Sequence, residues 1–335
     1  MRHLYTADLH LTDREQDKYR WDIFPWLHKQ VMKYKPKRLF FLGDLTDSKD
    51  FHSSYLTNRL VEEIDELAAR CPVYVLKGNH DYLKQEQQPF FRFFNTLNSR
   101  VEYISKPTER LIDGLKFLFL PHTLEWQSSW KRFSFSSYDR VLFHCAIGGA
   151  RTAAGFRLGG VPACVFNAVR ASAFAIGGDI HVPQVVGRAV YCGAPHPVHF
   201  GDEYQPRILL TTEENVLRTI PRDTVRKLSL SVRSMKELGR AGIRTGDMVR
   251  VVVHCNPEEC KDSTQIREDV ARAVRKRGGV LVGVEVHEMR RQRLGKLHTA
   301  PTLSAPKLLK DYALQHRMSV DEMQEGMFLL KEVQL

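Results

Sequence analysis

Short apolar runs alternate with amphipathic segments along the first two-thirds of the chain, a pattern that predicts an α/β fold. Apolar residues three or four positions apart predict a helix over about residues 17–34, ended by Pro36. A second helix is predicted from about Ser54 to Arg70, with Ser53 or Ser54 as its N-cap. Beyond residue 100, turns rather than long helices separate the apolar runs. We therefore expect a second, more antiparallel sheet packed on the first, with strands at 101–105, 111–120, 140–145, 173–178, 189–193 and 207–211.

The last third of the chain has a different organisation, and a domain boundary is expected near residues 219–224. A small β-α-β unit is predicted after it, from an extended run, a strand, a helix and a strand at about 226–232, 248–255, 263–277 and 280–287. Beyond a basic linker, two helices with apolar faces are predicted at about 305–316 and 319–332. The predicted domains are therefore residues 1–221, 222–290 and 291–335.

Positive charge is concentrated in the predicted small unit and the linker after it. The net charge of the chain is +11, and residues 222–296 contain 18 Lys+Arg against 10 Asp+Glu. Such a basic segment indicates a polyanionic partner, of which nucleic acid is the first candidate. The alternative interpretation is an ordinary solvated surface.

The composition also bears on the compartment. No apolar run approaches the roughly 20 residues that a membrane span needs, so no membrane partner is expected. The first residues are too polar for a signal peptide, and the six cysteines form no Cys-x-x-Cys pair. We therefore expect a cytoplasmic protein with reduced, mostly buried thiols. A metal site at Cys255 and Cys260, near His254, is an alternative for that pair.

Five short segments with metal-ligating side chains each follow an apolar, strand-like run. Ligands of open α/β sheets bind beyond the carboxyl ends of the strands, so these segments are expected to converge on one place. Mixed Asp, His and Asn donors in this number suit two borderline metal ions rather than one. The segments are Asp8-Leu-His10, Gly43-Asp44, Gly78-Asn79-His80-Asp81, His144 and Gly178-Asp179-Ile180-His181.

A two-metal phosphoesterase needs a bridging carboxylate, terminal ligands for each ion, an activated water and a group near the leaving oxygen. We assign the bridge to Asp44 and the leaving-group role to His80. The water between the metals would then attack phosphorus in line. The terminal ligands are expected to be Asp8, His10 and His181 for one ion, and Asn79, His144 and Asp179 for the other. The alternative for each residue is that its side chain is buried and hydrogen-bonded for structural reasons and binds no metal ion.

Two further features border these segments. Asp47 and His52 follow the Gly43-Asp44 turn and, with Asp81, are candidates for supporting positions around the ligands; a solvated loop is the alternative. The glycine-rich stretch 148–160 comes directly after His144 and predicts a long loop. That loop either shapes the cleft or is a flexible connector.

The order of these segments resembles the calcineurin-like metallophosphoesterase superfamily over about residues 1–210. More narrowly, the chain resembles SbcD-type DNA repair nucleases, including their bacteriophage relatives. The narrower resemblance lies in Gly178-Asp179-Ile180-His181-Val-Pro-Gln184, Val190-Tyr191-Cys192-Gly193-Ala194-Pro195 and Phe200-Gly201-Asp202. Asp179 stands where that family usually has His, and an Asp donor is harder, which favours manganese or magnesium somewhat.

The resemblance implies a fold, an activity and partners. The implied fold is a four-layer α/β/β/α sandwich of two mixed sheets flanked by helices, with a small β-α-β cap domain and a C-terminal helical pair. The implied activity is that of an exonuclease and endonuclease on DNA, acting in recombination, repair or replication. Its two divalent ions would be manganese, with magnesium, iron or zinc as alternatives.

SbcD-type nucleases work as dimers with an SbcC-type ATPase that has a long coiled coil. For this chain, the resemblance implies a homodimer in the cytoplasm, or in the host cytoplasm if a phage encodes it. Residues 222–290 would then cap the site and hold DNA. The C-terminal helices would bind the base of the ATPase coiled coil, with packing on their own domain as the alternative.

The sequence also offers candidates for contact with DNA. Aromatic rings can stack on bases, and basic side chains can bind phosphates. The candidates are Trp126, Trp130, Lys131, Arg132, Arg275, Lys276 and Arg277. Two other functions remain open from the sequence: a phosphatase or phosphodiesterase acting on small phosphoesters or nucleotides, and a non-catalytic DNA-binding scaffold.

Overall fold

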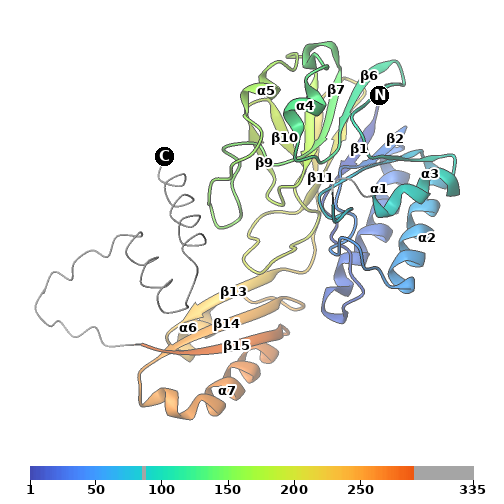
Figure 1. Cartoon of the computed structure of the whole chain (residues 1–335). Helices are drawn as coiled ribbons and strands as arrows, with labels where there is room; N and C mark the ends of the chain where they lie inside the picture. Colours follow the sequence, from blue (N-terminus) through green and yellow to red (C-terminus); the bar gives the residue numbers. More distant parts are fainter. Residues whose placement is uncertain (85–87, 290–335) are drawn as a thin grey trace, which may run out of the picture. The chain divides into compact units, whose positions relative to one another are not determined.

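A computed structural model of the chain describes residues 1–84 and 88–289 (Figure 1). The chain divides into two compact units, residues 1–288 and 289–335. The helices predicted at 305–316 and 319–332 lie outside the described residues. The predicted division at residue 221 falls inside the first unit and stays a prediction.

The first sheet has the strand order β12-β11-β1-β2-β3-β4. Its parallel part consists of β1 (His3–Thr6), β2 (Arg38–Phe41), β3 (Val73–Leu76) and β4 (Val101–Ile104). On the other side of β1, β11 (Arg207–Thr211) and β12 (Leu217–Pro221) continue the sheet in antiparallel pairing. The carboxyl ends of β1, β2 and β3 therefore meet at one edge.

The second sheet has the strand order β5-β6-β7-β8-β10-β9. Parallel pairing joins β6 (Leu115–Leu120), β7 (Arg140–His144), β8 (Phe174–Gly178) and β10 (Ala189–Tyr191). The outer strands β5 (Thr108–Ile112) and β9 (Gln184–Val186) pair antiparallel. The prediction of a more antiparallel second sheet was wrong, because both sheets are mixed and because β4 and β11 belong to the first sheet.

The apolar stretch 111–120 is a hairpin rather than one strand. Asp113 and Gly114 adopt φ of 51° and 81° and turn the chain between β5 and β6. Both central residues of such a tight turn need positive φ, which Asp-Gly supplies at low cost. The prediction of one strand over residues 111–120 overlooked the turn that this Asp-Gly pair signals.

The two sheets pack face to face, and helices cover their outer faces (Figure 1). Between the sheets lie side chains of one face of each strand, such as Tyr5, Phe40, Phe117 and Ile176. The opposite face of the first sheet packs against α1 (Ile23–Tyr34) and α2 (Ser54–Arg70). The predicted α/β sandwich of two mixed sheets flanked by helices is confirmed.

The outer face of the second sheet is covered by short elements instead of long helices. Phe166 of α5 (Cys164–Asn167) and Trp130 of α4 (Trp126–Trp130) pack there with Phe135 of η3 (Phe135–Ser137). Two further short elements, η2 (Phe90–Phe93) and α3 (Phe94–Leu97), pack beside β4.

The first predicted helix begins later than expected. Residues Glu15–Asp22 form a 3₁₀ segment, η1, and the α-helix starts only at Ile23. Pro25 has no N–H to donate to the carbonyl of Trp21, so an α-helix cannot run unbroken through this point. The predicted end is confirmed, because Lys35 adopts a left-handed conformation directly before Pro36. The second predicted helix is α2, and Ser53 caps it by accepting a hydrogen bond from the Leu56 N–H.

The small basic unit is a parallel three-stranded sheet with helices. Its strands are β13 (Lys227–Val232), β14 (Met248–Cys255) and β15 (Val280–Glu288). Its helices are α6 (Met235–Arg240) and α7 (Ser263–Lys276), which follows η4 (Glu259–Asp262). The predicted β-α-β unit is present, with α6 added in the first crossover. Valines of the strands and of α7 form its own apolar core.

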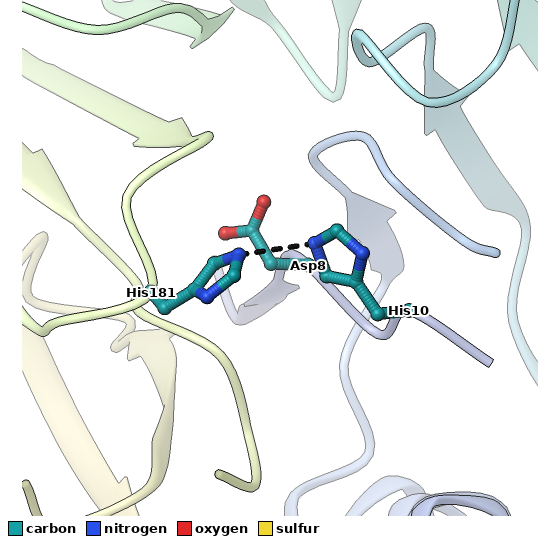
Figure 2. A group of neighbouring side chains, drawn as sticks. All are labelled: Asp8, His10 and His181. Carbon is teal, nitrogen blue, oxygen red and sulfur yellow. Dashed lines mark hydrogen bonds between the residues drawn. The ribbon is translucent and has the colours of Figure 1, made fainter. Parts of the chain in front are cut away.

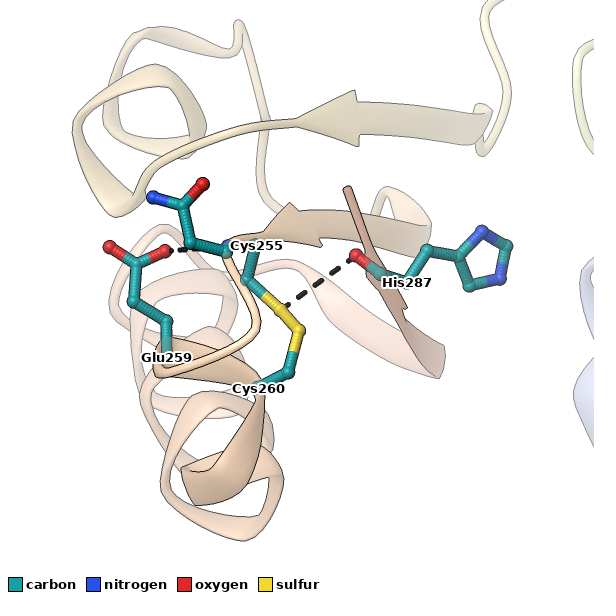
Figure 3. The surroundings of a disulfide bond; sticks show 5 residues. Cys255, Glu259, Cys260 and His287 are labelled. Carbon is teal, nitrogen blue, oxygen red and sulfur yellow. Dashed lines mark hydrogen bonds between the residues drawn. A yellow bond between two sulfur atoms is a disulfide. The ribbon is translucent and has the colours of Figure 1, made fainter. Parts of the chain in front are cut away.

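A disulfide joins Cys255 and Cys260 at the turn between β14 and η4 (Figure 3). Cys255 Sγ lies 3.7 Å from the carbonyl oxygen of His287, and the Asn256 N–H donates to Glu259 at 3.0 Å. The expectation of reduced thiols was therefore wrong for this pair, since the tight turn brings the two side chains together. Cys71, Cys145 and Cys192 are free and buried, and Cys164 is free and exposed.

Within the described part of the chain, no helix has the length and apolar character needed to cross a bilayer.

Candidate metal centre

The five donor segments lie at the carboxyl ends of five strands, taken from both sheets. Three follow β1, β2 and β3, one is the last residue of β7, and one follows β8. Hydrogen bonds join segments that are far apart in sequence. The Asp179 N–H donates to Asp8 Oδ1 at 2.9 Å, and His144 Nε2 lies 2.9 Å from the Asn79 amide. The structure thus brings the seven predicted ligands to one place, where the sheets share an end.

Asp8, His10 and His181 form one group whose ligand atoms all lie within 4.8 Å of one another (Figure 2). The Nε2 atoms of His10 and His181 are 3.0 Å apart and point toward each other beside the Asp8 carboxylate. Asp8 Oδ2 is buried and has no hydrogen-bond partner. Two facing imidazole nitrogens and an unpartnered carboxylate oxygen are suited to holding a cation.

Asp44 lies between this group and His144. Its Oδ2 atom is 3.6 Å from His10 Nε2 and 3.5 Å from His144 Nε2. Its Oδ1 atom accepts a hydrogen bond from the His80 backbone N–H at 2.8 Å. Asp44 also belongs to two groups with metal-ligand spacing, one with His10 and His80 and one with Asp8 and His144. One carboxylate therefore faces imidazoles of both predicted metal sets.

Asn79 and Asp179 complete the second side of the cluster. With its amide nitrogen facing the carboxylates, Asn79 donates to Asp44 Oδ2 at 3.0 Å and to Asp179 Oδ1 at 3.3 Å. Asp179 Oδ1 also lies 3.8 Å from His144 Nε2. Asp179 therefore lies beside Asn79 and His144, the two residues with which it was predicted to share a metal ion, and one of its oxygens faces the cluster.

The backbone of the ligand segments is unusual. Asp8, His10, Asp44 and Asp179 have φ of 55°, 44°, 53° and 88°, in the left-handed region that most residues avoid. Strained conformations of this kind concentrate at functional sites. Each strand here ends in a sharp turn that directs its carboxylate or imidazole into the cluster.

Glycines allow the close approach of these turns. A Cβ on Gly43 would lie 2.0 Å from His144 Nδ1, and a Cβ on Gly78 would lie 2.1 Å from Asp44 Oδ1. Any larger residue at either position would displace a candidate ligand. The glycines of the Gly-Asp and Gly-Asn-His-Asp segments are therefore required by packing.

Burial and crowding of like charges perturb the carboxylates. Burial, together with the charge of Asp44, raises the pKa of both Asp8 and Asp81 to about 7. Burial also raises the pKa of Asp179. Burial opposes the charge of Asp44 as well, but the neighbouring His144 and His10 hold its pKa below the usual range. Among the candidate ligand carboxylates, Asp44 is therefore the one that the protein itself keeps ionised.

The imidazoles divide into two kinds. Burial would lower the pKa of His144 and of His10, but nearby carboxylates raise both, chiefly Asp44 for His144 and Asp47 for His10. Burial and the charge of His10 lower the pKa of His181 to about 3, so His181 is neutral. A neutral imidazole offers a lone pair to a metal ion without first losing a proton.

His80 is held by the backbone at the edge of the cluster. Its Nδ1 donates to the carbonyl oxygen of Asp47 at 2.6 Å, which leaves Nε2 available. Its ring lies 4.7 Å from the ring of His10. Asp47 also approaches His10, with Oδ1 3.4 Å from His10 Nδ1, and it pairs with Arg14. Asp47 therefore positions both histidines.

The other two predicted supporting residues lie outside the ligand cluster. His52 contacts Thr46 Oγ1 through Nε2 at 2.8 Å and stacks on Phe90 with ring centroids 4.0 Å apart. Asp81 is fully buried and accepts a hydrogen bond from the Gly78 N–H at 2.6 Å. Both hold the loops that carry Asp44 and Asn79.

The predicted DNA contacts differ in exposure. Trp130 is only 3% exposed and packs against Phe135 and Phe166. A buried indole offers no face to a base, so the structure argues against a contact at Trp130. Trp126 is half-buried against the same apolar cluster, while Lys131 and Arg132 are exposed.

Three basic residues at the end of α7 were also predicted to contact DNA. Arg275 and Lys276 are exposed. Arg277 instead donates to the carbonyl oxygens of Ala273 and Gly239, which ties the end of α7 to α6. Arg277 is thus engaged within its own domain.

Sequence reasoning missed Arg20. Its buried guanidinium donates to the carbonyl oxygens of His10 and Val198 and pairs with Asp17 at 3.1 Å. It therefore fixes the backbone of a candidate ligand. Arg20 lies three residues after Asp17, and this spacing on η1 was the only signal in the sequence.

The donors present fit a pair of divalent cations. Carboxylates, imidazoles and an amide converge, one carboxylate faces both sides, and Asp8 Oδ2 has no partner. Two packed mixed sheets with such a cluster at their shared end are the features of a metal-dependent phosphoester hydrolase.

The family model for calcineurin-like phosphoesterases matches residues 1–183, and the chain belongs to that family. The match covers every candidate ligand and ends before residues 190–202, on which the narrower resemblance to SbcD-type nucleases depends. A search of curated proteins finds no match to the chain.

Proposed function

We propose that this phosphoesterase is a two-metal DNA nuclease that hydrolyses phosphodiester bonds by in-line attack. The position of Asp44 Oδ2 is the observation that supports two metal ions, because this atom lies 3.6 Å from His10 Nε2 and 3.5 Å from His144 Nε2. A carboxylate so placed is suited to bridging two ions about 3.5–4 Å apart. Asp8, His10 and His181 would hold one ion. Asn79, His144 and Asp179 would hold the other, with the Asn79 amide turned so that its oxygen, and not its nitrogen, faces the ion.

The two ions, when bound, would polarise the phosphoryl oxygens and acidify a water molecule for attack. The chain's own residues would do the rest. His80, held through Nδ1–H by the Asp47 carbonyl, would act as the doubly protonated imidazolium, donate its Nε2 proton to the leaving oxygen and become the neutral imidazole. Arg20 and Asp47 would keep His10 in position.

The basic small unit supports DNA as the substrate. Exposed Arg272, Arg275 and Lys276 line hollows along α7, and residues 222–296 carry an excess of eight positive charges. Phosphate contacts of this kind supply most of the sequence-independent affinity for DNA. Small phosphoesters would not need such a surface.

The partner and the preferred metal are further parts of the proposal. By its resemblance to SbcD-type nucleases, the chain would act as a homodimer with an SbcC-type ATPase, in recombination, repair or replication. Manganese is the metal that we expect, because four of the seven candidate ligands are oxygen donors, namely Asp8, Asp44, Asn79 and Asp179. Asp179 adds an oxygen where SbcD-type nucleases usually have a nitrogen.

The test measures manganese-dependent cleavage of linear duplex DNA, single-stranded DNA and bis(p-nitrophenyl) phosphate. We expect His80→Ala to lower kcat on DNA by about 10²- to 10⁴-fold. The loss on bis(p-nitrophenyl) phosphate is expected to be much smaller, because nitrophenolate leaves without a proton. His28→Ala, a histidine on α1 outside the cluster, is the matched control and should leave both rates unchanged.

Two results would contradict the proposal. Full activity of His80→Ala on DNA would remove the role given to that residue. Rapid cleavage of the small diester by the wild-type protein, with no binding or cleavage of DNA at about 0.1 M salt, would favour a small-molecule phosphodiesterase instead.

A further inference from the structure

We propose that the loop from Ile147 to Val161 is a contact site for unpaired nucleotides beside the metal centre. Phe156 would stack on a base, and Arg151 and Arg157 would neutralise phosphates. This inference rests on the proposed function and names the form of nucleic acid that the site receives, namely a single-stranded segment.

The loop is a built structure and not a loose connector. Its ends pair at Ile147 and Val161, and its arms pair at Arg151 and Arg157. Backbone hydrogen bonds run along it, including Gly148 N–H to Val161 O at 2.8 Å and Leu158 N–H to Ala150 O at 2.7 Å. The tip is closed by the Thr152 N–H, which donates to the carbonyl oxygen of Phe156 at 2.9 Å.

The base of the loop is anchored in the apolar layer outside the second sheet. Ile147, Ala150 and Val161 are buried there. Gly160 adopts φ of +135°, and a Cβ at that position would lie 2.3 Å from the carbonyl oxygen of Ala146. The arms therefore lie close together, and their backbone hydrogen bonds reduce the entropy that ordering the tip would cost on binding.

The tip combines an exposed ring with unopposed positive charge. Phe156 is 72% exposed, and Arg151 and Arg157 flank it on the surface. The loop from Ile147 to Val161 contains two arginines and no lysine, aspartate or glutamate. Among the residues that the structure describes, no carboxylate forms an ion pair with either loop arginine. Arg151 Nη1 donates to the Gly155 carbonyl oxygen at 3.0 Å, which holds that guanidinium against the loop tip without neutralising its charge. An aromatic face between two guanidinium groups that lack a carboxylate partner is the arrangement that binds bases and phosphates of a single strand.

Gln184 ties this tip to the metal centre. Its side-chain amide accepts from the Arg151 N–H and donates to the Arg151 carbonyl, both at 2.8 Å. Gln184 follows His181 by three residues, a backbone span of at most about 11 Å. The other end of the loop begins three residues after His144. Both anchors thus lie close to candidate ligands, within a few nucleotides of the bond to be cut.

Single-stranded nucleic acid is the occupant that the chemistry favours. A protein partner would be expected to cover a wider apolar area than one ring, and a duplex would keep its bases away from Phe156. The positive charge without acidic residues matches a phosphate backbone. The loop would therefore hold the unpaired end or gap on which the nuclease acts.

The experiment compares binding of a labelled single-stranded oligonucleotide, with EDTA to prevent cleavage, for the wild-type protein and five variants. Phe156→Ala should weaken binding roughly tenfold, and Phe156→Tyr should restore it, as expected for base stacking. Arg151→Ala/Arg157→Ala should make the salt dependence shallower, with the slope of log K against log salt changing by about 1.4 for two lost phosphate contacts. Leu111→Ala, a 73% exposed apolar side chain on β5, is the control for Phe156.

The matched charge control is Arg70→Ala/Arg218→Ala, which removes two exposed arginines from α2 and β12. It should leave the affinity and the salt slope close to wild type. All variants should hydrolyse bis(p-nitrophenyl) phosphate at the wild-type rate with manganese, because none changes a candidate ligand.

Unchanged oligonucleotide affinity in Phe156→Ala, with normal binding by the wild-type protein, would overturn this inference and leave the proposed nuclease function standing. Failure of the wild-type protein to bind or cut any DNA would overturn both. Equal weakening by Leu111→Ala would show that the effect is not specific to the loop, and would also overturn the inference.

Discussion

Replacing Gly78 by alanine tests the metal centre most directly. The added methyl group would lie 2.1 Å from Asp44 Oδ1 and 2.5 Å from the Asp44 backbone nitrogen. Ordinary contact begins at 3.4 Å, so Asp44 would have to move by about 1 Å, a displacement that can cost about 10²-fold in rate. The shift would also disturb the hydrogen bond from the His80 N–H to Asp44 Oδ1.

The substitution should lower both the free energy of unfolding and kcat. Overpacking of this kind lowers the free energy of unfolding by about 1–3 kcal/mol. If Asp44 bridges two ions, kcat should fall by about 10²-fold, because both ions depend on its position. The assay measures the initial rate on bis(p-nitrophenyl) phosphate with manganese, manganese binding by calorimetry, and urea unfolding in EDTA.

Gly242→Ala is the matched control. Gly242 is exposed, has no heavy atom within 4 Å of its would-be Cβ, and carries no positive φ. The same substitution there should change the free energy of unfolding by less than about 0.5 kcal/mol and leave kcat unchanged. A Gly78→Ala protein with wild-type kcat, manganese affinity and unfolding midpoint would refute the assigned role of Asp44.

Three further predictions concern the stability and covalent structure of the protein outside the metal centre. Burial lowers the pKa of His3 to about 4 against the opposing effect of Asp113, so the unfolded chain binds more protons between pH 4 and 6.5. The contribution of His3 to the free energy of unfolding should therefore drop by about 3 kcal/mol as the pH falls from 6.5 to 4, and His3→Gln should make the pH dependence measured in urea titrations shallower by about that amount; parallel curves would contradict it. Alkylation of the denatured protein should label four cysteines before reduction and six after it, by mass spectrometry, because Cys255 and Cys260 are joined; six labels without reduction would disprove the bond. Trp130→Ala should lower the free energy of unfolding by about 3–5 kcal/mol through the cavity that it leaves, with no direct effect on DNA affinity; a selective loss of DNA binding in a stable variant would restore its predicted contact role.

The sequence predicted the strands that end in donor residues, because strands buried on both faces read as short apolar runs before polar turns. The order of those turns then located the cluster, since parallel strands bring their carboxyl ends to one edge. The sequence alone could not assign β11 to the first sheet. The antiparallel pairing of β11 with β1 depends on packing between residues about 200 positions apart, which no local pattern reveals.

Local chemistry accounts for the other differences. Asp113-Gly114 signals a turn, but the apolar residues on both sides read as one run. Trp130 is buried because it packs against Phe166, and no local sequence pattern reveals that contact. The disulfide needs two side chains to meet across a turn, and spacing alone does not show that.

The left-handed backbone at Asp8, His10, Asp44 and Asp179 has a consequence for how this protein can change over time. This conformation costs about 1–2 kcal/mol for most residues other than glycine, and less for Asp, whose side chain can hydrogen-bond locally. Burial of the carboxylates adds to the cost. Glycine at any of these positions would relieve the strain while removing a ligand. Laboratory evolution that selects only for heat resistance should therefore lose these residues early, so a screen for thermostable variants has to select for catalysis in the same step.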